Sequence, residues 1–167
     1  MSSGGGDPAL RELLSTRRVA ALGTLHGGAP YVSMVPFAIT RDGRAFLIHV
    51  SELSAHTEDM LTDPRVSLLV TGEEKPGVIA QELPRVTILG KAAPLEDPSR
   101  DYDAGKARYL ERFPDAEPIF GLGGFSLFTI RPEHVRWIGG FAGAQTLTPG
   151  ELAQAARKGA ATKGPAN

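Results

Sequence analysis

The sequence LIHVSELSAHTEDMLTDPRVSLL, residues 47–69, predicts a β-strand, a tight polar turn, a short helix and a second strand. Ser54 stands where the helix is expected to begin, and serine is a preferred N-cap residue. The first turn of a helix leaves backbone N–H groups without partners and carries a positive potential, so it attracts anions. With the Ser54 hydroxyl and the His56 ring close to that turn, the segment predicts a site for an anion such as phosphate. The alternative is an ordinary capped helix, with Thr57 and Glu58 facing water.

The flanking sequence predicts short strands joined mostly by hairpins. Turn residues separate apolar, β-branched runs, and residues 125–130 alternate apolar and polar side chains as a half-buried strand does. Strands are expected at residues 19–24, 31–39, 45–50, 65–71, 85–92, 125–130 and 134–138, and helices at 8–14, 54–62 and 102–113. Six or more antiparallel strands with short flanking helices indicate a mainly β (α+β) fold, built as a closed or nearly closed barrel.

Length and composition limit the class of protein. A chain of 167 residues forms one ordinary domain, which we expect to span residues 1–152. Residues 153–167 are rich in alanine, glycine and lysine and are expected to form a flexible C-terminal tail. The net charge of −1 argues against nucleic acid as a partner, and no apolar run is long enough to cross a membrane. The start of the chain lacks a basic and apolar signal segment, so we expect a cytoplasmic protein.

Several chemistries are excluded or disfavoured by the residue types present. The absence of cysteine from the sequence excludes disulfides, iron–sulfur clusters and cysteine nucleophiles. No serine has the spacing of a nucleophile elbow, so a hydrolytic triad is not expected. The four histidines, His26, His49, His56 and His134, provide no helical ligand pair, so no metal site is expected and no residue is assigned as catalytic. His49 stays open, because its imidazole either faces a ligand or bonds to a backbone carbonyl.

The segment at residues 47–69, followed by RVTILGKA at residues 85–92, resembles the FMN-binding split barrel of the pyridoxamine-phosphate-oxidase superfamily. The resemblance is nearest to the flavin-barrel domain of heme-utilisation proteins, which show a similar Leu-Ser-x-His-Thr stretch, Asp-Pro-Arg-Val-Ser, and a Gly-Gly-Phe like that at residues 139–141. It covers roughly residues 10–152. It implies a split β-barrel of the FMN-binding type, and a homodimer with the cofactor site at the subunit interface.

The resemblance also implies which residues hold the cofactor. The strand that matches residues 31–38 lies along the edge of the flavin ring, and the following strand end and helix start fall on the ribityl and phosphate positions. Arg85 falls where a side chain of a later strand reaches the cofactor, often across the dimer interface. The cofactor-binding residues expected on this basis are Ser33, Met34, Val35, Pro36, His49, Val50, Ser51, Ser54, His56 and Arg85.

The sequence departs from the oxidase pattern at the positions that carry positive charge. Where pyridoxamine-phosphate oxidases have Ser-Arg-Lys, this chain has Ser-Ala-His at residues 54–56, and Ser33 and Ala38 replace Arg and Lys on the ring strand. Each charge-assisted hydrogen bond contributes about 1.5–3 kcal/mol, so losing two to four of them weakens FMN binding unless other groups compensate. Oxidation of pyridoxamine phosphate itself is therefore not expected.

Three functions follow from the resemblance. The main expectation is an FMN-binding flavoprotein that acts as a flavin-dependent oxidoreductase on a small-molecule substrate. The alternative is a heme-binding or heme-utilisation protein, and a further alternative is a cofactor-free structural dimer. Heme iron needs an axial ligand, and the family's heme-ligating histidine belongs to a separate C-terminal domain, so FMN is expected to bind in preference to hemin. For the dimer interface we expect the strand at residues 125–130 and, above all, Trp137, since Phe125 and Phe128 fit the core equally well.

Overall fold

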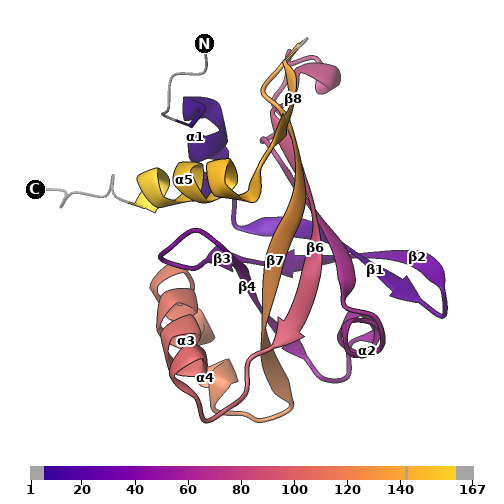
Figure 1. Cartoon of the computed structure of the whole chain (residues 1–167), viewed down its shortest axis with the longest axis vertical. Helices are drawn as coiled ribbons and strands as arrows, with labels where there is room; N and C mark the ends of the chain where they lie inside the picture. Colours follow the sequence, from indigo (N-terminus) through magenta and orange to yellow (C-terminus); the bar gives the residue numbers. More distant parts are fainter. Residues whose placement is uncertain (1–5, 142, 161–167) are drawn as a thin grey trace, which may run out of the picture.

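The computed structural model of the chain describes residues 6–141 and 143–160. Its eight strands form one antiparallel sheet in the order β2-β1-β5-β6-β7-β4-β3, with β8 beside β7. Figure 1 shows that the sheet is strongly curled, with β6 and β7 as its long central strands. The strands are β1 (Val19–His26), β2 (Ala29–Pro36), β3 (Ala38–Ile39), β4 (Phe46–Ser51), β5 (Arg65–Thr71), β6 (Arg85–Pro94), β7 (Phe125–Ile138) and β8 (Ala144–Leu147).

The helices cover the ends and one side of the curled sheet (Figure 1). α1 and α5 lie against each other, α2 packs beside β1, and α3 packs against β3 and β4. None of the helices in the described ranges has the length and apolar content needed to span a bilayer. The helices are α1 (Pro8–Thr16), α2 (Ala55–Thr62), α3 (Arg100–Arg112), α4 (Glu117–Phe120) and α5 (Pro149–Ala160), with 3₁₀ turns η1 (Ala80–Glu82) and η2 (Pro114–Ala116).

The sheet closes on itself through one buried residue. β2 and β3 stand at opposite ends of the strand order, yet they are consecutive in the chain and separated only by Phe37. Pro36 lacks an N–H group, so it cannot continue a ladder as a donor, and the Phe37 N–H donates instead to the Arg18 carbonyl at 3.0 Å. The expected single strand at residues 31–39 is therefore two strands, and β2 pairs with β1 alone instead of forming a hairpin with β4.

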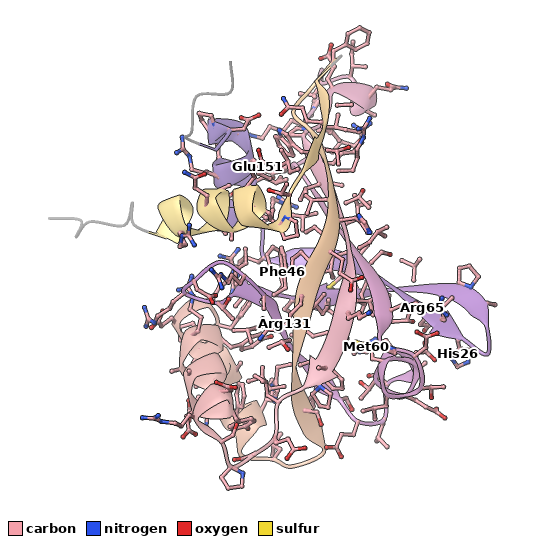
Figure 2. All side chains as sticks on the ribbon, viewed as in Figure 1. His26, Phe46, Met60, Arg65, Arg131 and Glu151 are labelled. Carbon is pink, nitrogen blue, oxygen red and sulfur yellow. The ribbon has the colours of Figure 1, made fainter. Side chains whose placement is uncertain are left out.

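Alternation along the strands places one face of the sheet in the core. Met60 of α2 and Phe46 of β4 point into this interior (Figure 2), and the fully buried Trp137 belongs to the same cluster. A second, smaller cluster fills the space between the sheet and α3; its buried members are Ala38, Leu47, Tyr109 and Leu127. Consecutive residues of β4 contribute to the two clusters in turn, because successive side chains of a strand point to opposite faces.

Two strand expectations differ from the structure near the C-terminus. The expected strands at residues 125–130 and 134–138 are one strand, β7, because a register shift opposite Leu89 and Gly90 accommodates Pro132 within the ladder. β8, which the sequence analysis did not predict, pairs with the end of β7. Its four residues are mostly exposed, so they carry no apolar alternation that could have predicted a strand.

The domain boundary expected at residue 152 also differs from the structure. α5 continues to Ala160, and Ala153 and Ala155 are buried together with Leu152. The segment before α1 lies close to α5, since a Cβ added to Gly6 would lie 3.1 Å from the Ala155 side chain. Residues 153–160 therefore belong to the domain, and the remainder of the expected tail, residues 161–167, lies outside the described residues.

The expectation that Trp137 lies at a dimer interface is wrong. Its side chain is fully buried, and the indole Nε1–H donates to Asp7 Oδ2 at 2.7 Å. The other carboxylate oxygen of Asp7 accepts from the Ala9 N–H at 2.9 Å, so Asp7 is the N-cap of α1. One carboxylate thus connects the start of α1 to the core, a link over 130 residues that no local pattern reveals.

We expect Asp7→Ala to destabilise the fold by about 2–4 kcal/mol, because it removes a helix cap and leaves a buried indole donor without a partner. Chemical denaturation followed by Trp137 fluorescence measures this loss. Glu12→Ala, an exposed acidic position on the same helix, is the matched control and should change the unfolding free energy by less than about 0.5 kcal/mol. Equal effects of the two variants would contradict the structural role of Asp7.

Candidate functional site

Two of the predicted cofactor-binding residues meet where β2 passes the start of α2. The helix begins at Ala55 with Ser54 as N-cap, as predicted, although the Ser54 hydroxyl makes no capping hydrogen bond. Ser33 Oγ lies 3.0 Å from His56 Nδ1, so the edge strand and the helix start are in direct contact. Thr57 is buried and its hydroxyl donates to the Ser51 carbonyl at 2.7 Å, so only Glu58 of the residues expected in water is exposed.

The His56 ring is neutral and incompletely satisfied. Burial lowers its pKa below the ordinary value of 6.5, and the nearby Asp59 carboxylate opposes this shift without reversing it. Its Nε2 atom is buried without a hydrogen-bond partner among the described residues. A neutral imidazole cannot supply the positive charge that a phosphate needs, so the start of α2 offers dipoles in place of cations.

A second polar cluster lies on the same side of the sheet and was not predicted. Asp59 of α2 is buried and accepts a hydrogen bond from Thr24 Oγ1 at 2.7 Å, and its other oxygen lies 2.7 Å from His26 Nδ1. Burial acts to raise the pKa of Asp59, but the hydrogen bonds from Thr24 and His26 outweigh it, so the pKa is lowered. Thr24 and His26 share a strand face at spacing two, which is a signal visible in the sequence; their partner on α2 is not.

The remaining predicted residues do not gather around one site. The side chains of Val35 and Val50 are core residues, so they do not face a ligand. Met34 lies on the opposite face of β2 and is 63% exposed. The Arg85 guanidinium donates to the carbonyls of Gln81 and Leu83, so it anchors the loop before β6. Of the others, Pro36 is half-buried at the end of β2, and Ser51 is half-buried where its hydroxyl accepts from the Leu53 N–H.

His49 lies on the other side of β4, among aromatic rings. Its imidazole stacks on Phe120 with ring centroids 3.7 Å apart and an angle of 4° between the planes, and Tyr109 and Phe125 contact its edges. Burial, helped by the charge of Lys106, lowers the pKa of His49 to about 4. Neither alternative that the sequence left open describes this ring, because its surroundings are aromatic side chains of α3, α4 and β7.

The outer face of the sheet carries a groove of about 430 Å³, within the range of small-molecule sites. Its floor follows from the strand register. One row of paired residues crosses five strands on this face and consists of Val32, Gly23, Ser67, Leu89 and His134. The two smallest side chains stand in the middle of the row, so the surface is hollow between Val32 and Leu89. Adjacent strands are about 4.8 Å apart, which makes the hollow roughly 14 Å wide.

The lining of the groove combines apolar floor with a few polar groups. Leu25, Pro30, Tyr31 and Val66 extend the apolar surface around the central row. The polar groups at the rim include Arg65 (Figure 2) and Glu133. Arg65 is paired with Asp63 at 2.6 Å and is 69% exposed. Glu133 is the extra residue at the bulge of β7 and pairs with Lys91 at 3.3 Å.

The residues expected to hold FMN fit its phosphate poorly. Ser33 and His56 already bond to each other, and His56 is neutral. Arg85 does not supply the missing charge, since its guanidinium is held by backbone carbonyls. The carboxylates of Glu58 and the buried Asp59 lie within the same short helix, and their charge opposes an incoming phosphate.

A curled antiparallel sheet of this order, with helices at its ends, is a split β-barrel, as the resemblance predicted, and solved split barrels superpose on it closely. A sequence model described as pyridoxamine 5'-phosphate oxidase matches residues 7–139. The chain therefore belongs to the pyridoxamine 5'-phosphate oxidase family.

Several proteins similar to this chain are described by their connection with heme. The chain is 36% identical over 119 residues to the chloroplastic non-canonical heme oxygenase HOZ of Arabidopsis thaliana, which covers 70% of this chain and 34% of the plant protein. A heme-binding protein from Mycobacterium smegmatis superposes with a TM-score of 0.79 at 25% identity, covering 92% of this chain and 61% of that one. The heme storage protein HutZ from Vibrio cholerae gives a TM-score of 0.68 at 27% identity, covering 77% and 91%. The chain thus spans about a third of the plant enzyme.

We expect His49 to make folding stability depend on pH. Its pKa is about 4 when folded and 6.5 when unfolded, so between these values the unfolded chain binds a proton that the folded chain does not. The contribution of His49 to the free energy of unfolding is therefore fully present above pH 6.5 and is lost as the pH falls toward 4. We expect this loss to be about 1–2 kcal/mol, because the ring is partly exposed.

Denaturation at a series of pH values measures this slope, and His49→Phe is the informative comparison, because it keeps a ring against Phe120 and removes the titrating group. The difference in slope between the two proteins isolates His49 from other titrating residues such as His56. Parallel pH profiles for wild type and His49→Phe would contradict the assignment.

Proposed function

We propose that this chain is a heme-binding protein of the split-barrel family that functions in heme utilisation, with heme held in the groove on the outer face of the sheet. The observation that carries the proposal is the groove itself: an apolar floor across five strands, with the cation Arg65 at the rim. Heme is a flat, largely apolar macrocycle with two carboxylates at one edge, so it needs an apolar surface and a positive charge beside it.

The floor of the groove favours a planar apolar ligand. Gly23 has no side chain, and a Cβ added there would lie only 2.3 Å from Ser67 Oγ. No larger residue fits at this position without movement of Ser67, so the floor of the groove stays hollow in its middle. Val32 and Leu89 remain 69% and 48% exposed on either side of it. Covering them with a macrocycle removes apolar surface from water at about 25 cal/mol per Å².

The charge on this face favours an anionic ligand. Arg65 and Lys91 project from β5 and β6 on the outer face, and Arg136 follows His134 on the same face of β7. Asp63 and Glu133 pair with Arg65 and Lys91, so these five side chains leave one net positive charge. Heme propionates carry two negative charges, so the arrangement suits heme better than it suits a neutral ligand.

The names of the relatives support heme as the ligand class. The Arabidopsis protein is named a heme oxygenase, and the Mycobacterium and Vibrio proteins are described as heme-binding and heme storage proteins. Because the chain spans about a third of the plant enzyme, the proposal is heme binding within heme utilisation and does not extend to heme cleavage.

An FMN-dependent oxidoreductase is the second candidate function. The contact between Ser33 and His56 favours it, because it joins the strand and the helix start that the family resemblance assigns to the flavin. The family name also fits a flavin ligand. The neutral, partly acidic surroundings of the helix start count against tight binding of its phosphate.

We also propose that the chain is a homodimer and that the outer face of the sheet, in place of Trp137, forms the interface. Met34 and Leu69 are exposed apolar side chains on that face, outside the groove lining. A second copy would bury them and close the groove from above, placing the ligand between subunits.

We expect light scattering at micromolar concentration to show a dimer for the wild type and a monomer for Met34→Glu. Met34 is 63% exposed in the single chain, and in the proposed dimer a carboxylate at this position would be buried without a partner. Leu61→Glu on α2 is the matched control, since Leu61 is 64% exposed and lies away from the sheet face. It should stay dimeric. A wild-type monomer, or a dimer that both variants leave intact, would refute this interface.

We expect the full chain to bind hemin more tightly than FMN. Titrations followed by the Soret band and by flavin fluorescence measure the two affinities. Leu89→Glu should weaken hemin binding tenfold or more, about 1.4 kcal/mol, because it places a carboxylate against the macrocycle, while Leu61→Glu should leave it unchanged. Tighter binding of FMN than of hemin would reverse the order of the two candidate functions, and binding of neither would favour the cofactor-free dimer.

A further inference from the structure

We propose that an apolar tip at the far end of the sheet docks onto the groove of a second copy of the chain, so that Phe141 of the partner subunit covers the groove. The tip consists of two loops, residues 72–84 and residues 139–141. This inference rests on the homodimer proposed above, and it adds the contact that would close the ligand site between the subunits.

Two loops that are far apart in the sequence form the tip at the end of the long strands β6 and β7 (Figure 1). Residues 72–84 connect β5 to β6, and residues 139–141 follow β7. The two strands pair as far as both loops. The loops also approach each other directly, since a Cβ placed on Gly140 would lie 3.9 Å from the Glu82 carbonyl oxygen. The tip is therefore one surface.

The tip presents large apolar side chains to solvent. Phe141 is 79% exposed, and Ile79 and Val78 of the other loop are 56% and 43% exposed. Gly140 has a φ of 142°, which a residue with a side chain rarely adopts, so the loop that carries the Phe141 ring depends on glycine. Aromatic side chains are enriched at protein interfaces, and a ring held out on a glycine loop is suited to dock into a hollow.

The tip and the groove are complementary in charge. The loop at residues 72–84 has a net charge of −2, since it holds three glutamates and one lysine. None of these four side chains makes an ion pair with another described residue; they are Glu73, Glu74, Lys75 and Glu82. The side chains around the groove leave one net positive charge. An acidic tip would be repelled by an anionic membrane, whereas it matches the groove of a second copy.

The strands place the tip and the groove where a two-fold axis can exchange them. β5 runs from Ser67 in the groove through Leu69 to Thr71, where the tip begins, and these alternate residues share the outer face. The groove floor at Ser67 and the first residue of the tip are roughly 16 Å apart at ordinary strand spacing. An axis that lies between two facing sheets, crosses the strands and passes between Leu69 and Thr71 puts each tip over the groove of the other copy.

Such an axis also selects the part of the groove that Phe141 would cover. A rotation about a line that crosses the strands keeps their order, so the loop after β7 lands on the β6 and β7 side of the groove. Leu89 lies there and is 48% exposed. Phe141 of the partner subunit would cover Leu89 or a flat ligand resting on it, which would exclude water from the outer side of the site. The site is then complete only in the dimer.

Paired cysteines test the contact directly, because the chain contains no cysteine of its own. We expect Phe141→Cys and Leu89→Cys chains, co-expressed with different tags, to form a disulfide-linked mixed dimer on oxidation. Neither variant alone should cross-link, since each position lies far from its own copy across the axis. In the control pair, Leu122→Cys replaces Phe141→Cys; Leu122 is 74% exposed before β7, at the opposite end of that strand.

Sedimentation measures how much the tip contributes. Phe141→Glu should raise the dissociation constant of the dimer tenfold or more, whereas Phe141→Tyr and the control Leu122→Glu should leave it within about twofold. Salt should weaken the wild-type dimer, and Glu73→Gln with Glu74→Gln should reduce this salt dependence, because the contact pairs an acidic tip with a basic face. Phe141 is exposed in the single chain, so circular dichroism should show the same fold for all of these variants.

The outcomes separate this inference from the proposals on which it rests. If wild type is a monomer, the homodimer and the docking of the tip both fail. If wild type is a dimer but the mixed cross-link is absent or no stronger than in the control pair, the dimer stands and the docking is wrong. A specific cross-link in a protein that does not bind hemin supports the docking and refutes heme binding. An unchanged dissociation constant for Phe141→Glu would overturn the docking and leave the tip to a different partner.

Discussion

The structure depends on the register that the buried inner face of the sheet imposes across its central strands. One row of paired residues crosses β1, β5, β6 and β7 on this face, and each of its members is almost completely buried. The row consists of Leu22, Leu68, Ile88 and Val135. A slip of one residue in any of these strands would turn its apolar side chains to water. The inner row is thereby fixed, and the neighbouring outer row of Gly23, Ser67, Leu89 and His134 is fixed with it.

This coupling explains why a ligand groove can form on a face that the core does not use. Packing selects large side chains for the inner row, whereas the outer row is free to hold a glycine and a serine at its centre, and these create the hollow. The helices leave this part of the outer face uncovered, because α1, α2 and α5 pack at other parts of the sheet. The resulting groove is apolar in the middle and charged at the rim, which is the pattern that a flat amphipathic ligand requires.

The region that the family resemblance assigns to a flavin phosphate is occupied by a network of polar side chains. Two sets of hydrogen bonds join the β1–β2 hairpin to α2. Ser33 bonds to His56, and both Thr24 and His26 bond to Asp59. The buried carboxylate and the neutral imidazole of this network hold the helix against the sheet, and these groups have no net positive charge to offer a phosphate. The family fold is thus present here, while the position that the resemblance assigns to an anion lacks positive charge, as expected when function resides in sites and not in folds.

The elements around residues 47–69 follow from local sequence: the Ser54 cap, the helix that ends before Pro64 and the strands on either side all match the structure. The Asp7 cap, with Pro8 in the first turn, is likewise visible in the sequence. The order of short strands, together with the family motifs, was enough to predict the split barrel. What the tertiary structure alone decided are the long-range partners: Asp7 with Trp137, Asp59 with His26, and Gly23 with Ser67, Leu89 and His134. Local patterns report only which face a residue takes within its own strand, whereas the neighbour across the sheet is set by register and by the closure of the barrel at Phe37.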